Sequence, residues 1–184
     1  MSLTTDLYDP QDHHRFEPRA TRLPITHRDD IEVELWVGGA DSAIGDPVEE
    51  HHLEGAWLID CAGDLPQRFK EAAAAWFPRV FADLEVVPSS FHRLERLAKD
   101  VAAAVLGEAL DATELAGHAA PLRLMVMCKQ GMNRSALMAG LILRELGASP
   151  SEIVEAIRAA RPGALTNQTF VRLLLGEAEG NAAG

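Results

Sequence analysis

The chain has 184 residues, 47% of them hydrophobic, and a formal net charge of −11 at pH 7. The length fits one domain of about 150 residues with a terminal extension, and the apolar content suffices for a buried core. The acidic balance argues against a general nucleic-acid binder and against a protein that lies on anionic membranes, because both need basic patches. No apolar run approaches the ~18 residues of a membrane span, residues 1–18 lack the apolar stretch of a signal peptide, and two cysteines make no disulfide framework. We therefore expect a soluble, cytoplasmic protein.

Three parts are expected: an N-terminal arm (residues 1–30), a single domain (31–176) and a short tail (177–184). The arm is polar and rich in proline, so it is expected to lie on the domain or to be partly disordered. Two histidine pairs, His13-His14 and His51-His52, are interpreted as solvated surface rather than metal ligands, because no matching ligand cluster accompanies them.

Apolar patterns in the first half of the domain predict three strands. Residues 31–38 alternate apolar and acidic side chains and end at a glycine pair, as in an edge or half-buried strand. Residues 56–61 form a short, mostly apolar run that is typical of a buried strand. Residues 64–75 are expected to carry a short helix or a loop, and residues 76–87 a further strand before Pro88.

The second half alternates helices with one more strand. Apolar residues recur at helical spacing over 91–106, after Ser90 in the N-cap position. A loop over 107–121 leads to a buried strand at 122–128, and further helices are predicted over 134–146, 152–161 and 167–176. Strands separated by amphipathic helices predict an α/β fold with a mainly parallel central sheet flanked by helices. A ligand is then expected beyond the carboxyl ends of the strands, where Cys128 lies.

The segment from Cys128 to Ser135 carries the main functional signal. It passes from a buried strand through a polar turn into a helix, with the spacing Cys-x5-Arg-Ser. Such a turn can direct its N–H groups inward and bind phosphate, and Gly131 supplies the backbone freedom that it needs. Arg134 adds a bidentate fork, and a cysteine in so positive a setting reacts as a thiolate. The alternative is a structural cysteine buried at a strand end.

This loop, C-K-Q-G-M-N-R-S, resembles the signature loop of the cysteine-dependent protein tyrosine phosphatase superfamily, above all its dual-specificity branch. The predicted strands before it and the segment R-P-G-A-L-T-N-Q-T-F after it extend the resemblance over residues 31–175. The resemblance implies phosphate ester hydrolysis through a cysteinyl-phosphate intermediate, with an aspartic acid as general acid and then base, and with no metal or other cofactor. Met127 stands where the family usually has histidine. A weakly active or inactive phosphate-binding module is therefore an alternative.

The resemblance also assigns roles to single residues. Cys128 is the expected nucleophile and Ser135 the donor to the departing thiolate. Asp83 is the expected general acid, with Glu85 as the second choice.

Phosphate oxygens are expected to bind Arg134 and the loop residues, which are Lys129, Gln130, Gly131, Met132 and Asn133. In some relatives a cysteine at the place of Cys61 traps the nucleophile as a reversible disulfide. A plain buried thiol is the alternative for Cys61.

The expected substrates are phosphorylated tyrosine, serine or threonine in proteins, or a small phosphate ester. Lys129 resembles the lipid-phosphatase branch and residues 131–134 resemble RNA 5′-triphosphatases, so phosphoinositides and RNA ends are alternative substrates. The acidic net charge counts against both, and we expect no nucleic-acid or membrane partner. A sulfurtransferase-like enzyme with the same kind of loop is a further class, although the surrounding helices fit the phosphatases better.

Overall fold

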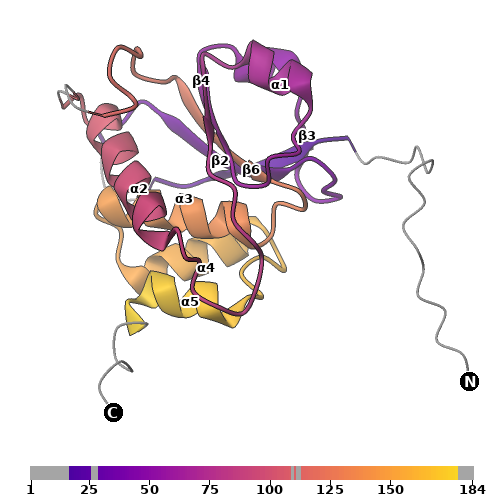
Figure 1. Ribbon diagram of the computed structural model, residues 1–184, viewed down its shortest axis with the longest axis vertical. Coiled ribbons are helices and arrows are strands. Elements are labelled where there is room, and N and C mark those ends of the chain that lie inside the picture. Colours follow the sequence, from indigo (N-terminus) through magenta and orange to yellow (C-terminus); the bar gives the residue numbers. More distant parts are fainter. Residues whose placement is uncertain (1–16, 26–28, 109, 111–112, 178–184) are drawn as a thin grey trace, which may run out of the picture.

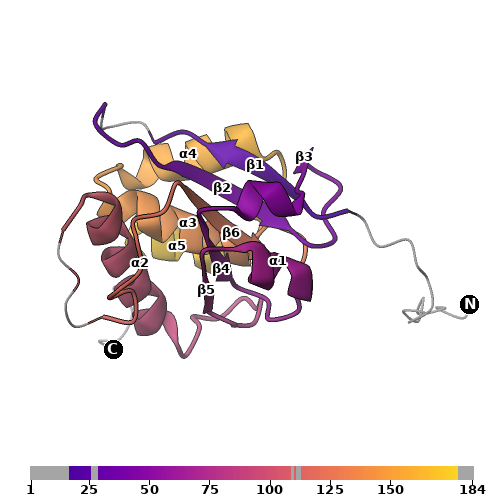
Figure 2. The ribbon, with the colours of Figure 1, turned by 90° about the horizontal axis from the view of Figure 1, so that it is seen from above.

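The computed structural model describes residues 17–25, 29–108, 110 and 113–177. A six-stranded sheet lies between two unequal helical layers (Figure 1). In chain order the elements are β1 (Arg19–Leu23), β2 (Glu34–Gly39), β3 (Asp46–Pro47), the 3₁₀ helix η1 (Glu50–Leu53), β4 (Ala56–Asp60), α1 (Gln67–Ala72), β5 (Ala75–Pro78), α2 (Phe91–Val105), β6 (Arg123–Cys128), α3 (Arg134–Glu145), α4 (Pro150–Ala160) and α5 (Gln168–Leu175). Helices α2 to α5 cover one face, and α1 with η1 covers part of the other (Figure 2).

The strands follow the order β3-β1-β2-β6-β4-β5, so that β6 lies near the centre of the sheet. β2, β6, β4 and β5 pair in parallel, whereas β1 is antiparallel to both β2 and β3. The predicted fold class, a mainly parallel sheet flanked by helices, is therefore confirmed. Both neighbours of β6 end at the same edge, because Gly39 pairs with Cys128 and Asp60 with Met127.

The side chains of β6 alternate between two hydrophobic cores. Leu124, Val126 and Cys128 belong to the core beneath α2 to α5, whereas Met125 and Met127 belong to the smaller core beneath α1. Successive side chains of a strand point to opposite faces, so Cys128 lies on the face that α3 covers. Met127 is fully buried and is directed to the other face.

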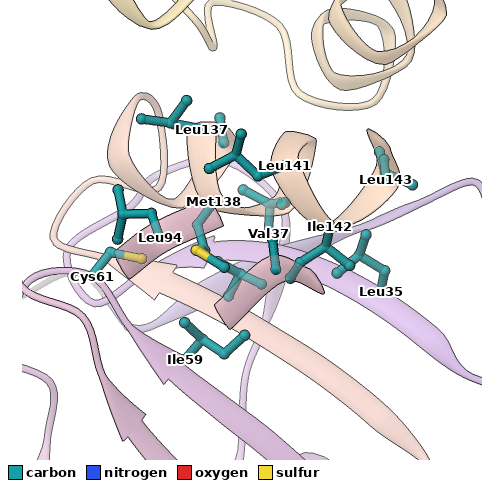
Figure 3. Packing of buried hydrophobic residues seen from close by; sticks show 14 of the residues in the cluster. Leu35, Val37, Ile59, Cys61, Leu94, Leu137, Met138, Leu141, Ile142 and Leu143 are labelled. Atoms are coloured by element: carbon teal, nitrogen blue, oxygen red, sulfur yellow. The ribbon is translucent and has the colours of Figure 1, made fainter. Parts of the chain in front are cut away.

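Helix α3 holds the turn after β6 in place. Its residues from Ser135 to Leu143 are all buried, and the helix packs on β2, β6 and α2. Figure 3 shows Ile142 of α3 beside Leu35 of β2, and Leu94 of α2 beside Cys61. A fully buried Leu or Ile side chain stabilises a fold by roughly 1.5–3 kcal/mol, so the start of α3 is firmly positioned against the end of β6.

The predicted N-terminal arm contains a strand that the sequence did not indicate. β1 pairs with β2 from Arg19 to Leu23, and its Ala20 and Leu23 are buried. Pro18 and Pro24 bound this strand so closely that its five residues give too short a pattern to recognise. His13-His14 and residues 178–184 of the predicted tail lie outside the described residues.

The strand predicted over residues 76–87 is only partly correct. β5 ends at Pro78, and the Arg79 N–H makes a last bond to the Asp60 carbonyl at 2.7 Å before the chain leaves the sheet. Except for the buried Phe81, the large apolar side chains that suggested a longer strand are more than half exposed; they are Val80, Leu84, Val86 and Val87. Residues 79–90 therefore form a loop, called the 79–90 loop below.

The helices lie close to where the sequence predicts them, and the short helix expected within residues 64–75 is α1. None of the helices in the described part of the chain has both the length and the apolar character needed to cross a bilayer.

Candidate active site

Cys128 begins a turn, residues 128–134, that is called the phosphate loop below. The Gly131 N–H donates to the Cys128 Sγ at 3.1 Å, and the Ser135 hydroxyl lies 3.3 Å from the same sulfur. Cys128 is only 2% exposed. An N–H group, a hydroxyl and the N-terminus of α3 together stabilise negative charge on the sulfur. The structure brings these three residues together, and their chemical roles stay predictions.

The phosphate loop packs tightly against the end of β2. Gly131 has a φ of +70°, a conformation that favours glycine. A Cβ atom at Gly131 would lie 2.6 Å from the carbonyl carbon of Gly38, and one at Gly39 would lie 2.4 Å from that of Gln130. The glycine pair predicted only as a strand end therefore allows the loop to approach the sheet.

Arg161, just after α4, holds the phosphate loop from the protein interior. Its side chain is fully buried, and its Nε donates to the Gly131 carbonyl at 2.5 Å. Its two Nη atoms donate to the Ser42 hydroxyl at 2.5 Å and to the Ile44 carbonyl at 3.1 Å. Burial lowers the pKa of the Arg161 guanidinium, and the nearby Cys128 partly opposes this change. Since arginine stays charged in proteins, Arg161 adds a positive charge beneath the loop.

Sequence reasoning did not identify Arg161 as part of the site. It stands at the end of a predicted helix, where a basic side chain usually lies in solvent and interacts favourably with the helix dipole. The available signal was its place directly before Pro162-Gly163, inside the segment that resembles the phosphatases.

Arg134 presents an unsatisfied donor at the loop. Its Nη1 contacts the carbonyls of Cys61 and Phe81 at 3.4 and 3.5 Å. Its Nε is buried and, among the described residues, has no hydrogen-bond partner. A buried donor without a partner costs roughly 1–3 kcal/mol, which an anion bound in the loop would recover.

Asp83, in the 79–90 loop, lies against the phosphate loop. One carboxylate oxygen accepts a hydrogen bond from the Asn133 side-chain amide at 3.1 Å, and the other accepts one from the Asn167 amide at 3.0 Å. The Asn133 Oδ1 in turn accepts from the Thr166 and Asn167 N–H groups at 2.9 and 3.1 Å. Glu85 is exposed and makes no hydrogen bond or ion pair within the part of the chain that the structure describes. Of the two predicted acids, only Asp83 contacts the loop.

The remaining loop residues face different surroundings. The Lys129 ammonium lies 3.9 Å from the Asp41 carboxylate, and the Lys129 carbonyl accepts from the Asp41 N–H at 2.8 Å. The Met132 carbonyl accepts from the Leu165 N–H at 2.9 Å, which ties the loop to the segment before α5. The Gln130 carbonyl accepts from Arg161 at 3.4 Å.

Cys61 follows β4 and lies next to the end of β6, where the parallel strands were expected to place it. Its N–H donates to the Met127 carbonyl at 2.8 Å, and both cysteines are free, buried thiols. Burial raises the pKa of the Cys61 thiol well above its usual value, and the nearby Cys128 raises it further. Cys61 is therefore a protonated thiol in this structure, and its redox role stays a prediction.

His51 and His52 both interact with Glu49 at the start of η1. The His52 Nδ1 accepts from the Glu49 N–H at 3.0 Å, and the His51 Nδ1 lies 3.2 Å from the Glu49 carboxylate. Within the described residues, no three histidine, cysteine or acidic side chains gather as metal ligands.

No protein-family model and no curated protein matches the sequence. Among solved structures, the chain is similar to human DUSP28, with 21% identity and a TM-score of 0.59 over 86% of this chain and 93% of that one. It is similar to the Yvh1 phosphatase domain from Chaetomium thermophilum, with 16% identity and a TM-score of 0.54 over 87% and 95% of the two chains. It is also similar to the human tyrosine phosphatase-like serine/threonine/tyrosine-interacting protein, with 17% identity and a TM-score of 0.54 over 86% and 95%.

At these identities the likeness concerns the fold. The chain has the fold of the dual-specificity phosphatases, which is the architecture that the resemblance of its phosphate loop implied.

Proposed function

We propose that this protein hydrolyses phosphate monoesters through a cysteinyl-phosphate intermediate. The observation that carries the proposal is the surrounding of Cys128, whose sulfur meets the Gly131 N–H and the Ser135 hydroxyl at the start of α3. The buried, unpartnered Nε of Arg134 beside it suits a phosphate oxygen. Together these groups favour a thiolate nucleophile and an anionic ligand at one place.

In the first step, the Cys128 thiolate attacks phosphorus. The S–P bond forms while the bond from phosphorus to the leaving oxygen breaks, and Asp83 gives its proton to that oxygen. Arg134 and the amides of residues 129–134 bind the three equatorial oxygens, whose charge they stabilise in the transition state. For this step Asp83 must exchange one of its two amide hydrogen bonds for the leaving group.

In the second step, water attacks phosphorus and releases the enzyme. Asp83 accepts a proton from the water as the new O–P bond forms and the S–P bond breaks. The Ser135 hydroxyl donates to the departing thiolate, from which it lies 3.3 Å away in the resting site. Gln130, whose side chain is exposed, is our candidate for positioning this water.

The substrates that we favour are phosphotyrosine, phosphoserine and phosphothreonine in proteins, followed by small phosphate esters. Phosphoinositides and RNA 5′-triphosphates are less favoured, because the net charge of −11 repels polyanions. Lys129, which suggested a lipid substrate, lies close to the Asp41 carboxylate, and this contact reduces its effective charge. A cytoplasmic location is part of this proposal.

A second candidate function is phosphate binding without turnover. It is supported by the two amide donors on the Asp83 carboxylate, which engage both oxygens that proton transfer would use. One protein with the same fold carries a name that describes it as phosphatase-like and as an interacting protein. In this case phosphorylated partners would bind the phosphate loop and stay intact.

Hydrolysis of aryl phosphates without added metal separates the two functions. We expect the wild type to turn over, vanadate to inhibit it, and Cys128→Ser to be inactive while still binding phosphate. Asp83→Asn should lower kcat by about 10²- to 10⁴-fold on an ester with a poor leaving group, and by less on one with a good leaving group.

Glu85→Gln is the matched control for Asp83→Asn, since it makes the same change two residues away in the same loop. It should keep kcat near the wild-type value. An inactive wild type that binds phosphate would overturn the hydrolysis proposal in favour of the binding module. Equal losses in Asp83→Asn and Glu85→Gln would refute the assignment of the acid.

A further inference from the structure

A cavity lies beside β5, at the base of the 79–90 loop. Its volume is about 500 Å³, and arginines from two elements line it: Arg79 directly after β5, and Arg93 and Arg96 on α2. Ser90, at the start of α2, also lines it. These four residues are called the basic pocket below.

The charges of the basic pocket are incompletely balanced. Two carboxylates share the cavity wall, and one of them, Glu114, forms an ion pair with Arg79. Asp100 is the other, and no ion pair joins it to Arg93 or Arg96. Neither of these arginines has a carboxylate partner within the part of the chain that the structure describes. Three arginines and two carboxylates leave the cavity wall with a formal charge of +1, in a chain with a net charge of −11.

The guanidinium groups lie close enough to affect one another. Burial lowers the pKa of Arg79, and the positive charge of Arg93 lowers it further. Glu114 offsets part of this repulsion at Arg79, and an anion bound between the two guanidinium groups would offset more of it. The Arg79 side chain is 19% exposed, but Arg93 is exposed, so solvent screens much of the interaction between them.

The donors of the basic pocket suit a phosphate group. Arginine binds two oxygens of a phosphate or carboxylate with its planar fork. The Ser90 hydroxyl makes no cap hydrogen bond to the described backbone of α2, so it remains available as a further donor. A tetrahedral anion needs several donors from different directions. The pocket offers them from Arg93 and Arg96 on α2 and from Arg79 directly after β5, whose Nη atoms also contact the Pro78 carbonyl and Glu114.

The basic pocket is separate from the phosphate loop but lies near it. Leu94, which lines the pocket, lies beside Cys61, whose carbonyl accepts from Arg134 (Figure 3). Arg79 begins the 79–90 loop, and Arg93 follows its end by one turn of α2. An anion held by both arginines would thus join the two ends of the loop that carries Asp83.

We propose that the basic pocket is a second oxyanion site, which binds a phosphate group through Arg79, Arg93 and Arg96 and thereby stiffens the 79–90 loop. The phosphate belongs either to a second phosphorylated position of the ligand in the phosphate loop or to a free phosphate ion. The proposal goes beyond the hydrolysis of phosphate esters and does not depend on it, because its test is binding.

Calorimetric titration with inorganic phosphate tests the site on the full chain. The wild type should show two sites, and Arg134→Ala should lose the one in the phosphate loop and keep the other. Adding Arg93→Ala and Arg96→Ala should lower the affinity of the remaining site at least about 10-fold, since the loss of one hydrogen bond to a charged group already lowers affinity by about that factor. Lys99→Ala with Arg172→Ala removes the same charge from exposed positions outside the pocket and should change its affinity less than about 3-fold.

If Arg134→Ala does not fold, the count of sites decides, because the Arg93→Ala and Arg96→Ala variant should show one site where the wild type shows two. A single phosphate site in the wild type would overturn the proposal. Equal weakening in the pocket variant and the charge-matched control would overturn it as well. Hydrogen exchange of residues 80–87 should slow with phosphate in Arg134→Ala, and unchanged exchange would refute the stiffening of the loop.

Peptides bound to Cys128→Ser identify the source of the phosphate. If one ligand fills both sites, the variant with Arg93→Ala and Arg96→Ala should bind a doubly phosphorylated peptide about 10-fold more weakly than the wild-type pocket does. Its affinity for a singly phosphorylated peptide should hardly change. If these two substitutions change the affinity for neither peptide but still remove the second site for inorganic phosphate, the ligand of the pocket is the free phosphate ion. Both results support the pocket and assign its ligand.

Discussion

Replacing Arg161 by methionine should destabilise the protein and loosen the phosphate loop. Methionine keeps much of the length of the stem but removes every donor. The Gly131 carbonyl and the Ser42 hydroxyl, each 2.5 Å from the guanidinium, would lose their shortest contact in a buried position. The Gly131 carbonyl left unpaired costs about 1–3 kcal/mol. Ser42 keeps its hydrogen bonds to the Ile44 backbone, so it loses only the bond to the charged guanidinium, which contributes about 1.5–3 kcal/mol. Together the two losses predict a decrease of about 4 kcal/mol. That is a large fraction of the roughly 5–15 kcal/mol by which a domain is stable.

Urea unfolding measures this loss. With a slope of about 2 kcal/mol per molar urea, the midpoint should fall by about 2 M. Phosphate binding under native conditions should weaken too, because the carbonyls of Gln130 and Gly131 lose the group that holds them.

Arg158→Ala is a matched control, since it removes an exposed arginine of α4 with a single hydrogen bond, to the Leu165 carbonyl. Its midpoint should fall by less than about 0.5 M, in line with the loss of one partly buried hydrogen bond. A drop of that small size for Arg161→Met, or equal drops for both variants, would refute the argument that Arg161 organises the loop.

Two further predictions concern Gly131 and Cys61. Gly131→Ala should lower the urea midpoint more than Gly147→Ala does, and it should abolish phosphate binding. Both glycines have a positive φ, so both substitutions strain the backbone. However, a Cβ at Gly131 would clash with backbone atoms and Arg161, whereas a Cβ at Gly147 would lie in open space. Similar midpoints for the two variants would contradict the steric reasoning. Since the pKa of Cys61 is raised in the folded protein, its contribution to stability is complete below pH 9.0, the usual thiol value, and is lost as the pH rises above it. Between pH 8 and 10.5 the unfolding free energy of the wild type should therefore fall by up to about 1.4 kcal/mol per pH unit more than that of Cys61→Ala, and parallel pH profiles would contradict this.

The phosphate loop could be predicted from the sequence because its residues are close together in the chain. Cys128, Gly131, Arg134 and Ser135 lie within eight residues, and strand, turn and helix follow from the pattern of those residues and their neighbours. Asp83 could be proposed as the acid only from the resemblance to known phosphatases, because nothing in the residues around it distinguishes it from a solvated carboxylate.

What the sequence concealed depends on contacts between distant segments. Arg161 meets Gly131 across 30 positions and Ser42 across 119, so no local pattern shows that its side chain is buried. The 79–90 loop misled the prediction for a different reason. Its valines have strand propensity, but the backbone leaves the sheet after Pro78, and side-chain preference alone does not detect that departure.

The order of strands also sets a condition on how the chain folds during synthesis. β2 and β4 do not pair with each other; each pairs with β6, which a ribosome makes last of the six strands. Until then the nascent chain holds two separate ribbons, β3-β1-β2 and β4-β5, each with an open edge where β6 will insert. Open apolar edges invite pairing with other chains, so a chain arrested before residue 123 should aggregate rather than fold. The same late strand ends in Cys128, and this thiol therefore emerges only when the sheet that shields it can close.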